Sequence, residues 1–119
     1  MTATSMKILI TIQKENVASR FDLASEILVA DVSEQQEAGQ PRIILLPGPG
    51  GESLCGLAIK ENVSVVICNG IEETHYEYLV WKKILVIDRI IGPWKQALDL
   101  AAQGGLKNGS ILPGASKSG

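Results

Sequence analysis

The stretch that decides the fold is Val63-Ser64-Val65-Val66-Ile67-Cys68, followed after a polar insert by Ile84-Leu85-Val86-Ile87-Asp88. Both runs are short and strongly apolar, as expected of strands that are covered on both faces. The insert between them has room for one short helix. Strand, helix and strand in this order predict two parallel neighbours joined by a right-handed crossover. Ligands of such open sheets bind beyond the carboxyl ends of the strands, so the residues after Cys68 are candidates for a binding site.

Three apolar runs that precede this unit predict further strands, at residues 7–12, 27–32 and 42–46. Their links are too short for crossovers, so these strands should form an antiparallel meander. Helices are expected over 52–61 and 73–82 and from Pro93 to the glycines at 104 and 105. Thr74 and Glu77 match a capping box, although a helix start directly after Gly70 fits as well. The order βββαβαβα predicts an α/β protein with a ribonuclease-H-like mixed five-stranded sheet and flanking helices.

The chain of 119 residues predicts a single domain over 6–105. Residues 1–5 form a polar leader, and residues 106–119 form a tail with a short extended piece at 110–112. The last five residues of this tail are expected to be disordered.

Charge and cysteine usage exclude several classes of protein. The net charge is −2 and basic residues do not cluster, so neither nucleic acid nor an anionic membrane is an expected partner. The two cysteines form neither a CxxC motif nor a disulfide framework, and no signal peptide is recognisable. We expect a cytoplasmic protein that is a monomer or a weak homodimer.

Cys68 and His75 are the candidate metal ligands. Cys68 ends the first apolar run, and His75, the only histidine, follows within two turns of the expected helix. Thiolate sulfur favours copper(I), zinc and iron–sulfur species, and imidazole binds copper, iron or zinc. The two side chains are therefore predicted to share a crevice. The alternatives are a buried structural cysteine and a surface histidine.

Other residues near the same edge are candidate donors to an anionic ligand. Arg20 offers charge-assisted hydrogen bonds, with a solvated loop charge as the alternative. The backbone amides of Asn69 and Gly70, like those of residues 50 and 51, are neutral donors. Cys55 lies in the first turn of its expected helix. Packing against Ile59 is the favoured interpretation, and a thiol pKa lowered by the helix N-terminus is the alternative.

Several short motifs also occur in the order seen in a known family: Met6-Lys7-Ile8, Val17-Ala18-Ser19-Arg20-Phe21, Cys68-Asn69-Gly70-Ile71, and Ile91-Gly92-Pro93 followed by Ala97 and Leu98. Over residues 6 to about 105 the chain resembles proteins similar to nitrogenase iron–molybdenum cofactor carriers and to the carboxyl-terminal domain of the cofactor-synthesis enzyme. The resemblance implies a ribonuclease-H-like domain that holds a metal–sulfur cluster or its precursor. Relatives in sulfate-reducing bacteria include an orange protein with a molybdenum–copper sulfide cluster. Asp22 and Asn69 stand where this family commonly has glycine.

Residues and resemblance together predict a non-enzymatic carrier for an iron–molybdenum or molybdenum–copper cluster, with the proteins that donate and accept the cluster as partners. A metal-independent regulatory or interaction domain of the same fold is the alternative. A nuclease is the least favoured reading, because two-metal catalysis needs converging carboxylates. The first strand contains no acid, and Asp22, Asp31 and Asp88 lie at separate strand borders.

Overall fold

The computed structural model describes residues 4–46, 48 and 50–114, with side chains from Met6 onward. Residues 115–119, which are expected to be disordered, lie outside this part. So do two residues of the turn that precedes the first helix. The elements in chain order are β1 (Thr4–Gln13), β2 (Asn16–Val17), β3 (Glu26–Ser33), β4 (Arg42–Leu45), α1 (Gly51–Lys60), β5 (Val65–Ile67), α2 (Glu73–Trp81), β6 (Leu85–Ile87) and α3 (Trp94–Ala102). None of the described helices is long and apolar enough to cross a membrane.

The strands form one mixed sheet in the order β4-β3-β1-β5-β6. β1 pairs antiparallel with β3 and parallel with β5, and β5 pairs parallel with β6. The predicted mixed α/β architecture is thus confirmed, with one correction. The link after β1 contains the two-residue strand β2, which pairs with the end of β1 and raises the described sheet from five strands to six. β1 also begins at Thr4, so it includes the last two residues of the expected leader.

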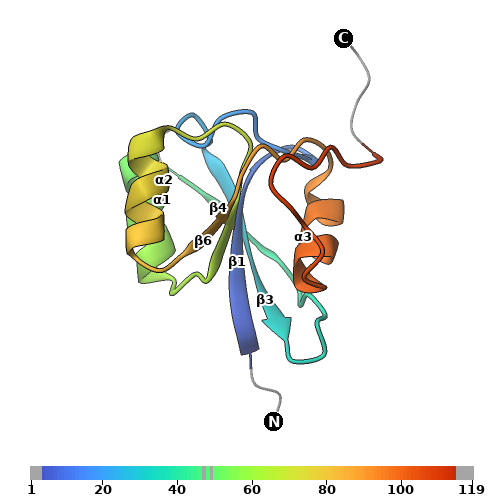
Figure 1. Cartoon of the computed structure of the whole chain (residues 1–119). Coiled ribbons are helices and arrows are strands. Elements are labelled where there is room, and N and C mark those ends of the chain that lie inside the picture. Colours follow the sequence, from blue (N-terminus) through green and yellow to red (C-terminus); the bar gives the residue numbers. More distant parts are fainter. Residues whose placement is uncertain (1–3, 47, 49, 115–119) are drawn as a thin grey trace.

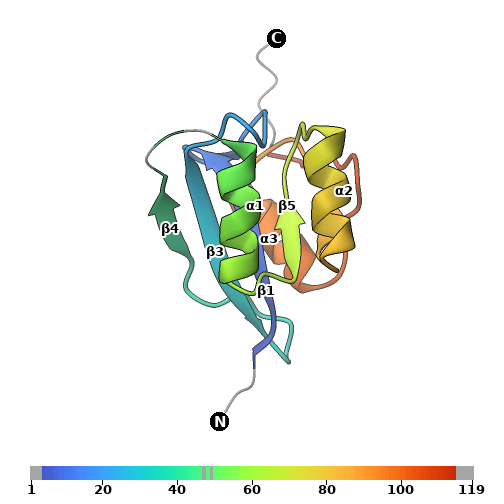
Figure 2. The same ribbon diagram turned by 90° about the vertical axis from the view of Figure 1, so that its left-hand side faces the viewer.

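Helices cover both faces of the sheet. α1 and α2 lie side by side on one face and α3 lies on the other, as Figures 1 and 2 show. Alternate residues of β1 serve the two cores: Ile8 and Ile10 pack in the cluster that includes α3, and Leu9 packs in the cluster that includes α1 and α2. This alternation follows from the two-residue period of a strand.

The segment after α3 packs against the fold. Leu106 and Leu112 are buried in the same cluster as residues of α3. The backbone N–H of Leu112 donates to the carbonyl of Ile91 at 2.9 Å, and a parallel bridge joins Ile91 to Ile111. The short extended piece expected at 110–112 is therefore present as this bridge.

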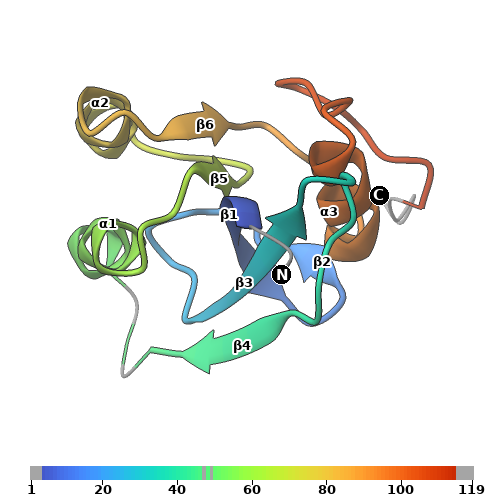
Figure 3. The ribbon, with the colours of Figure 1, turned by 90° about the horizontal axis from the view of Figure 1, so that it is seen from below.

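Three connections meet beyond the carboxyl ends of the parallel strands. The amide of Phe21 donates to the carbonyl of Gly70 at 2.7 Å, and the amide of Val17 donates to the carbonyl of Gly92 at 2.9 Å. The first bond ties the loop after β2 to the loop after β5, and the second ties β2 to the loop after β6. α1 and α2 run back along the sheet, so their N-termini lie at the same edge, seen at the top of Figure 1. Figure 3, viewed from below, shows both helices on one side of the sheet.

Thr11 in β1 carries an unsatisfied buried hydroxyl. Its side chain is fully buried, and its Oγ1 has no hydrogen-bond partner among the described residues. Thr11→Val keeps the shape and removes the unpaired hydroxyl, so it should raise the free energy of unfolding by about 1–2 kcal/mol in urea denaturation.

The matched control for this change is Thr11→Ser, which keeps the hydroxyl and deletes a methyl group. It should lower the free energy of unfolding by about 1 kcal/mol. A Val variant less stable than the wild type would show that the hydroxyl has a partner in solution.

Candidate functional site

Two adjoining cavities open between the N-terminal halves of α1 and α2. One, of about 360 Å³, is lined by residues that include Cys55, Gly56 and Tyr78. The other, of about 580 Å³, reaches toward the loop after β2. Because Glu52, Thr74 and His75 line both, the cavities form one continuous depression, here called the α1–α2 groove. Its full lining is Asp22, Gly50, Gly51, Glu52, Ser53, Cys55, Gly56, Glu72, Thr74, His75 and Tyr78.

His75 occupies the middle of this groove. Its imidazole lies against the backbone of Gly51, where a Cβ atom would overlap with Nε2 and stand 2.7 Å from Cε1. The ring also lies 5.9 Å, centroid to centroid, from the buried ring of Phe21. Neither ring nitrogen makes a hydrogen bond to another residue that the structure describes. The groove thus holds a half-buried imidazole in a fixed place with its coordinating atoms unused.

The N-termini of α1 and α2 border the groove without side-chain caps. Gly50 and Glu72 are the N-cap residues, and neither helix has a side-chain cap hydrogen bond. The predicted capping box is wrong, because α2 begins at Glu73 and Thr74 is already its second residue. Uncapped helix N-termini offer free N–H groups to an anion. Here Glu52 and Glu72 line the same space and oppose a bare anion electrostatically.

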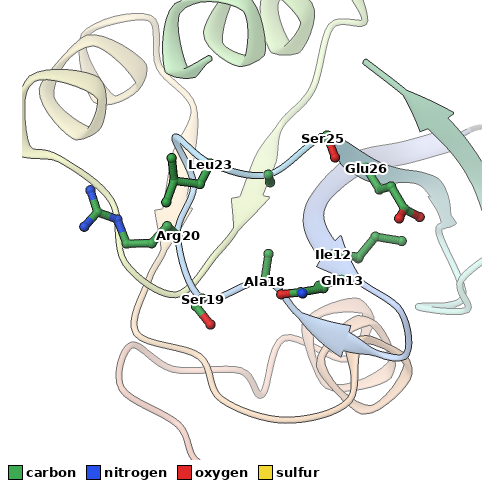
Figure 4. A pocket seen from close by; sticks show the side chains of 9 residues that line it. Ile12, Gln13, Ala18, Ser19, Arg20, Leu23, Ser25 and Glu26 are labelled. Atoms are coloured by element: carbon green, nitrogen blue, oxygen red, sulfur yellow. The ribbon is translucent and has the colours of Figure 1, made fainter. Parts of the chain in front are cut away.

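Arg20 does not face the groove as a free cation. Its guanidinium donates to the Asp22 carboxylate at 3.1 and 3.2 Å, and this pairing holds the pKa of Asp22 below its ordinary value. Arg20 lines a separate cavity of about 370 Å³ within the loop after β2, drawn in Figure 4. Since Asp22 lines the α1–α2 groove, the ion pair lies between the two spaces.

Gly70 is brought close to Arg20, but its amide is already used. The Gly70 N–H donates to the carbonyl of Ser19 at 2.9 Å, as part of a short parallel bridge between Arg20 and Gly70. The carbonyl of Asn69 accepts from the amide of Arg89 at 3.0 Å. The Gly70 amide is therefore engaged between neighbouring loops, whereas at Asn69 it is the carbonyl, and not the predicted amide donor, that makes the bond between loops.

Cys68 lies in the core. Its side chain is 0 % exposed and lines neither cavity of the groove. Burial, reinforced by the negative charge of Asp88, raises the pKa of the thiol to about 12, so the side chain is protonated at neutral pH. The structure thus offers His75, and not Cys68, to a ligand in the groove. Coordination by Cys68 stays a prediction.

Sequence reasoning named Gly51 and Cys55 as separate candidates but missed that α1 places both beside His75. Gly51 and Cys55 are four residues apart and so share one side of α1, while His75 and Tyr78 share one side of α2. All four line the groove. These spacings were visible in the sequence, but the packing of α1 on α2 was not. Of the two interpretations of Cys55, the structure favours a buried packing residue, because burial raises the pKa of the thiol to about 11 where the helix N-terminus would lower it.

The His75–Gly51 contact predicts opposite effects for two alanine substitutions in α1. Gly51→Ala introduces a Cβ where the imidazole lies, so it should displace His75 and cost about 1–3 kcal/mol of stability. Gly56→Ala, one turn further along, meets no atom within 4 Å and should gain about 0.5–1 kcal/mol through helix propensity. Urea unfolding gives both energies, and the NMR signals of the imidazole report its position. Equal effects of the two substitutions would contradict the contact.

Comparison with known proteins identifies the family and the fold. The profile of the family described as dinitrogenase iron-molybdenum cofactor matches residues 6–104. No curated protein matches the chain.

Solved structures provide several similar folds. A protein from Methanocaldococcus jannaschii, provisionally described as a dinitrogenase, is 24 % identical with a TM-score of 0.69, and the match covers 92 % of this chain and 96 % of that one. The apo form of the orange protein from Desulfovibrio gigas is 18 % identical with a TM-score of 0.67, covering 97 % and 100 %. A Thermotoga protein provisionally described as a NifB protein is 18 % identical with a TM-score of 0.65, covering 96 % and 99 %. At these identities the likeness shows the fold, and the profile match over most of the chain shows that this protein belongs to the dinitrogenase iron-molybdenum cofactor family.

Proposed function

We propose that this protein is a non-enzymatic carrier that holds a metal–sulfur cluster or cofactor precursor in the α1–α2 groove. The observation that carries the proposal is the imidazole of His75, which lies in the groove with both ring nitrogens free of hydrogen bonds to described residues. Imidazole is a ligand for iron and copper. Membership of the dinitrogenase iron-molybdenum cofactor family supports a cargo of this class.

The ligand set favours transport over catalysis. Within the described residues, no three His, Cys, Asp or Glu side chains are grouped so that they could hold a metal ion. A metal that stays for catalysis is usually fixed by three or four protein ligands. One imidazole, assisted by backbone amides of the uncapped helix N-termini, would hold a preformed cluster and still release it.

The charges around the groove suggest how such a cargo is accepted. Sulfido clusters of molybdenum are anionic, whereas Asp22, Glu52 and Glu72 make the groove acidic. Arg20 is the nearby cation, and its side chain is half exposed but bound to Asp22. In our proposal an incoming cluster competes with Asp22 for the guanidinium. The ion pair then acts as a latch that keeps Arg20 in place until cargo arrives.

The direct test is anaerobic reconstitution of the whole chain with tetrathiomolybdate and copper(I), and separately with iron and sulfide. Stoichiometric metal with charge-transfer absorption is expected for the wild type. His75→Ala should lower retained molybdenum or iron by at least about tenfold. Glu77→Gln, on the exposed part of the same helix, is the matched control and should retain the full amount. A wild type that takes up neither cluster would favour a metal-independent interaction domain instead.

The latch makes a second prediction, concerning charge. Asp22→Asn frees the guanidinium and should tighten cluster binding, while Arg20→Ala should weaken it. Because this contact is partly exposed, the difference between the variants should shrink as salt rises. Affinities can be followed by absorption titration at low and high ionic strength. Unchanged affinity in both variants would remove Arg20 from the site.

A further inference from the structure

The α1–α2 groove brings the second cysteine of the chain toward the histidine. The imidazole of His75 lies on Gly51, and Cys55 follows Gly51 by one helical turn on the same side of α1. Side chains of a helix lean toward its N-terminus, so that of Cys55 leans toward the turn that contains Gly51. Cys55 and His75 line the same cavity of about 360 Å³. A residue with a sulfur ligand and a residue with a nitrogen ligand thus line one cavity, which opens to solvent.

We infer that Cys55 and His75 together bind a single copper(I) ion between α1 and α2. Thiolate and imidazole are both ligands for copper, and the thiolate selects the soft monovalent ion. Copper(I) is satisfied by two ligands, whereas structural zinc takes four. No third side chain of a suitable kind completes a larger set in the described part of the chain. The number and the kind of ligands therefore favour copper(I) over zinc.

The surroundings of the pair suit this ion. Gly56 is exposed and lines the cavity. Its adjacent residues and the local helix backbone aside, a Cβ at that position would meet no atom within 4 Å, so the cavity is open on this side. The remaining residues around the cavity are Glu52, Thr74 and Tyr78. Burial raises the pKa of the Cys55 thiol to about 11 and so opposes its ionisation, as it does for Cys68, but Cys55 differs from Cys68 in lining the cavity. Binding therefore replaces the thiol proton by the metal: the S–H bond breaks, a copper–sulfur bond forms, the proton leaves to solvent, and copper stays monovalent.

This site is separable from the proposed carriage of a cluster. A bare ion needs Cys55, whereas the cluster proposal depends on His75 and the Arg20 latch and makes no use of Cys55. Loss of copper(I) with retained molybdenum in Cys55→Ser would separate the two activities. Proton release also makes copper binding tighter as pH rises.

The test is an anaerobic competition titration of the whole chain with copper(I) held by bicinchoninate. The wild type should remove one equivalent of copper from the chelator. Cys55→Ser and His75→Ala each remove a direct ligand, so each should weaken copper binding by more than about 100-fold. That is the largest loss expected when a residue that only hydrogen-bonds to a ligand is removed. Cys68→Ser is the matched control, because this second buried cysteine lines neither cavity of the groove, and it should bind as the wild type does.

X-ray absorption of the copper-loaded wild type gives an answer that does not depend on the folding of any variant. One sulfur and one nitrogen neighbour are expected. A wild type that leaves all copper with the chelator would overturn the inference. So would a sulfur-only coordination shell, or loss of binding in Cys68→Ser but not in Cys55→Ser.

Discussion

The parallel pairing of β1 with β5 is the constraint on which the rest of the molecule depends. β1 is central in the sheet, and its register with β5 sets Ile8 beside Val65 and Ile10 beside Ile67. Because the strands point the same way, their carboxyl ends meet at one edge, and helices that return between parallel strands begin there. The N-termini of α1 and α2 and the loop after β2 are brought together by this one choice of direction. An antiparallel β5 would have separated them.

At that edge the described residues show a close contact between the His75 imidazole and the backbone of Gly51, and no group of three metal-ligating side chains. His75 lies against this backbone and near the ring of Phe21. Packing fixes the position of the imidazole, so neither ring nitrogen is needed for a hydrogen bond that would hold it in place. In the proposed carrier role, few bonds from the protein would allow the cargo to exchange. Beside the groove, Arg20 and Asp22 neutralise each other's charge in an ion pair.

Much of this could be read from the sequence, and the failures have physical causes. Apolar runs and link lengths predicted the mixed sheet, and the strand end at Cys68 pointed to the edge where the N-termini of α1 and α2 lie. β2 was missed because two residues carry no periodicity. The sequence could not show that Cys68 lies under the loops, because which connection covers a strand end is decided by tertiary packing. The Arg20–Asp22 ion pair depends on loop geometry, and the nearness of α1 to His75 depends on helix packing, neither of which has a local signal.

The segment after α3 belongs to the folded domain, although it lies beyond the family match. The family likeness ends at residue 104, yet Leu106 and Leu112 are buried in the core beneath α3, and Leu112 lies under Gly92. Gly92 has a φ of 130°, where a side chain would collide with Leu112. The border drawn by sequence likeness therefore cuts through a packed interior. The physical domain is larger than the evolutionary one, and Leu106 and Leu112, which lie beyond the family match, complete the core that α3 forms on this face of the sheet.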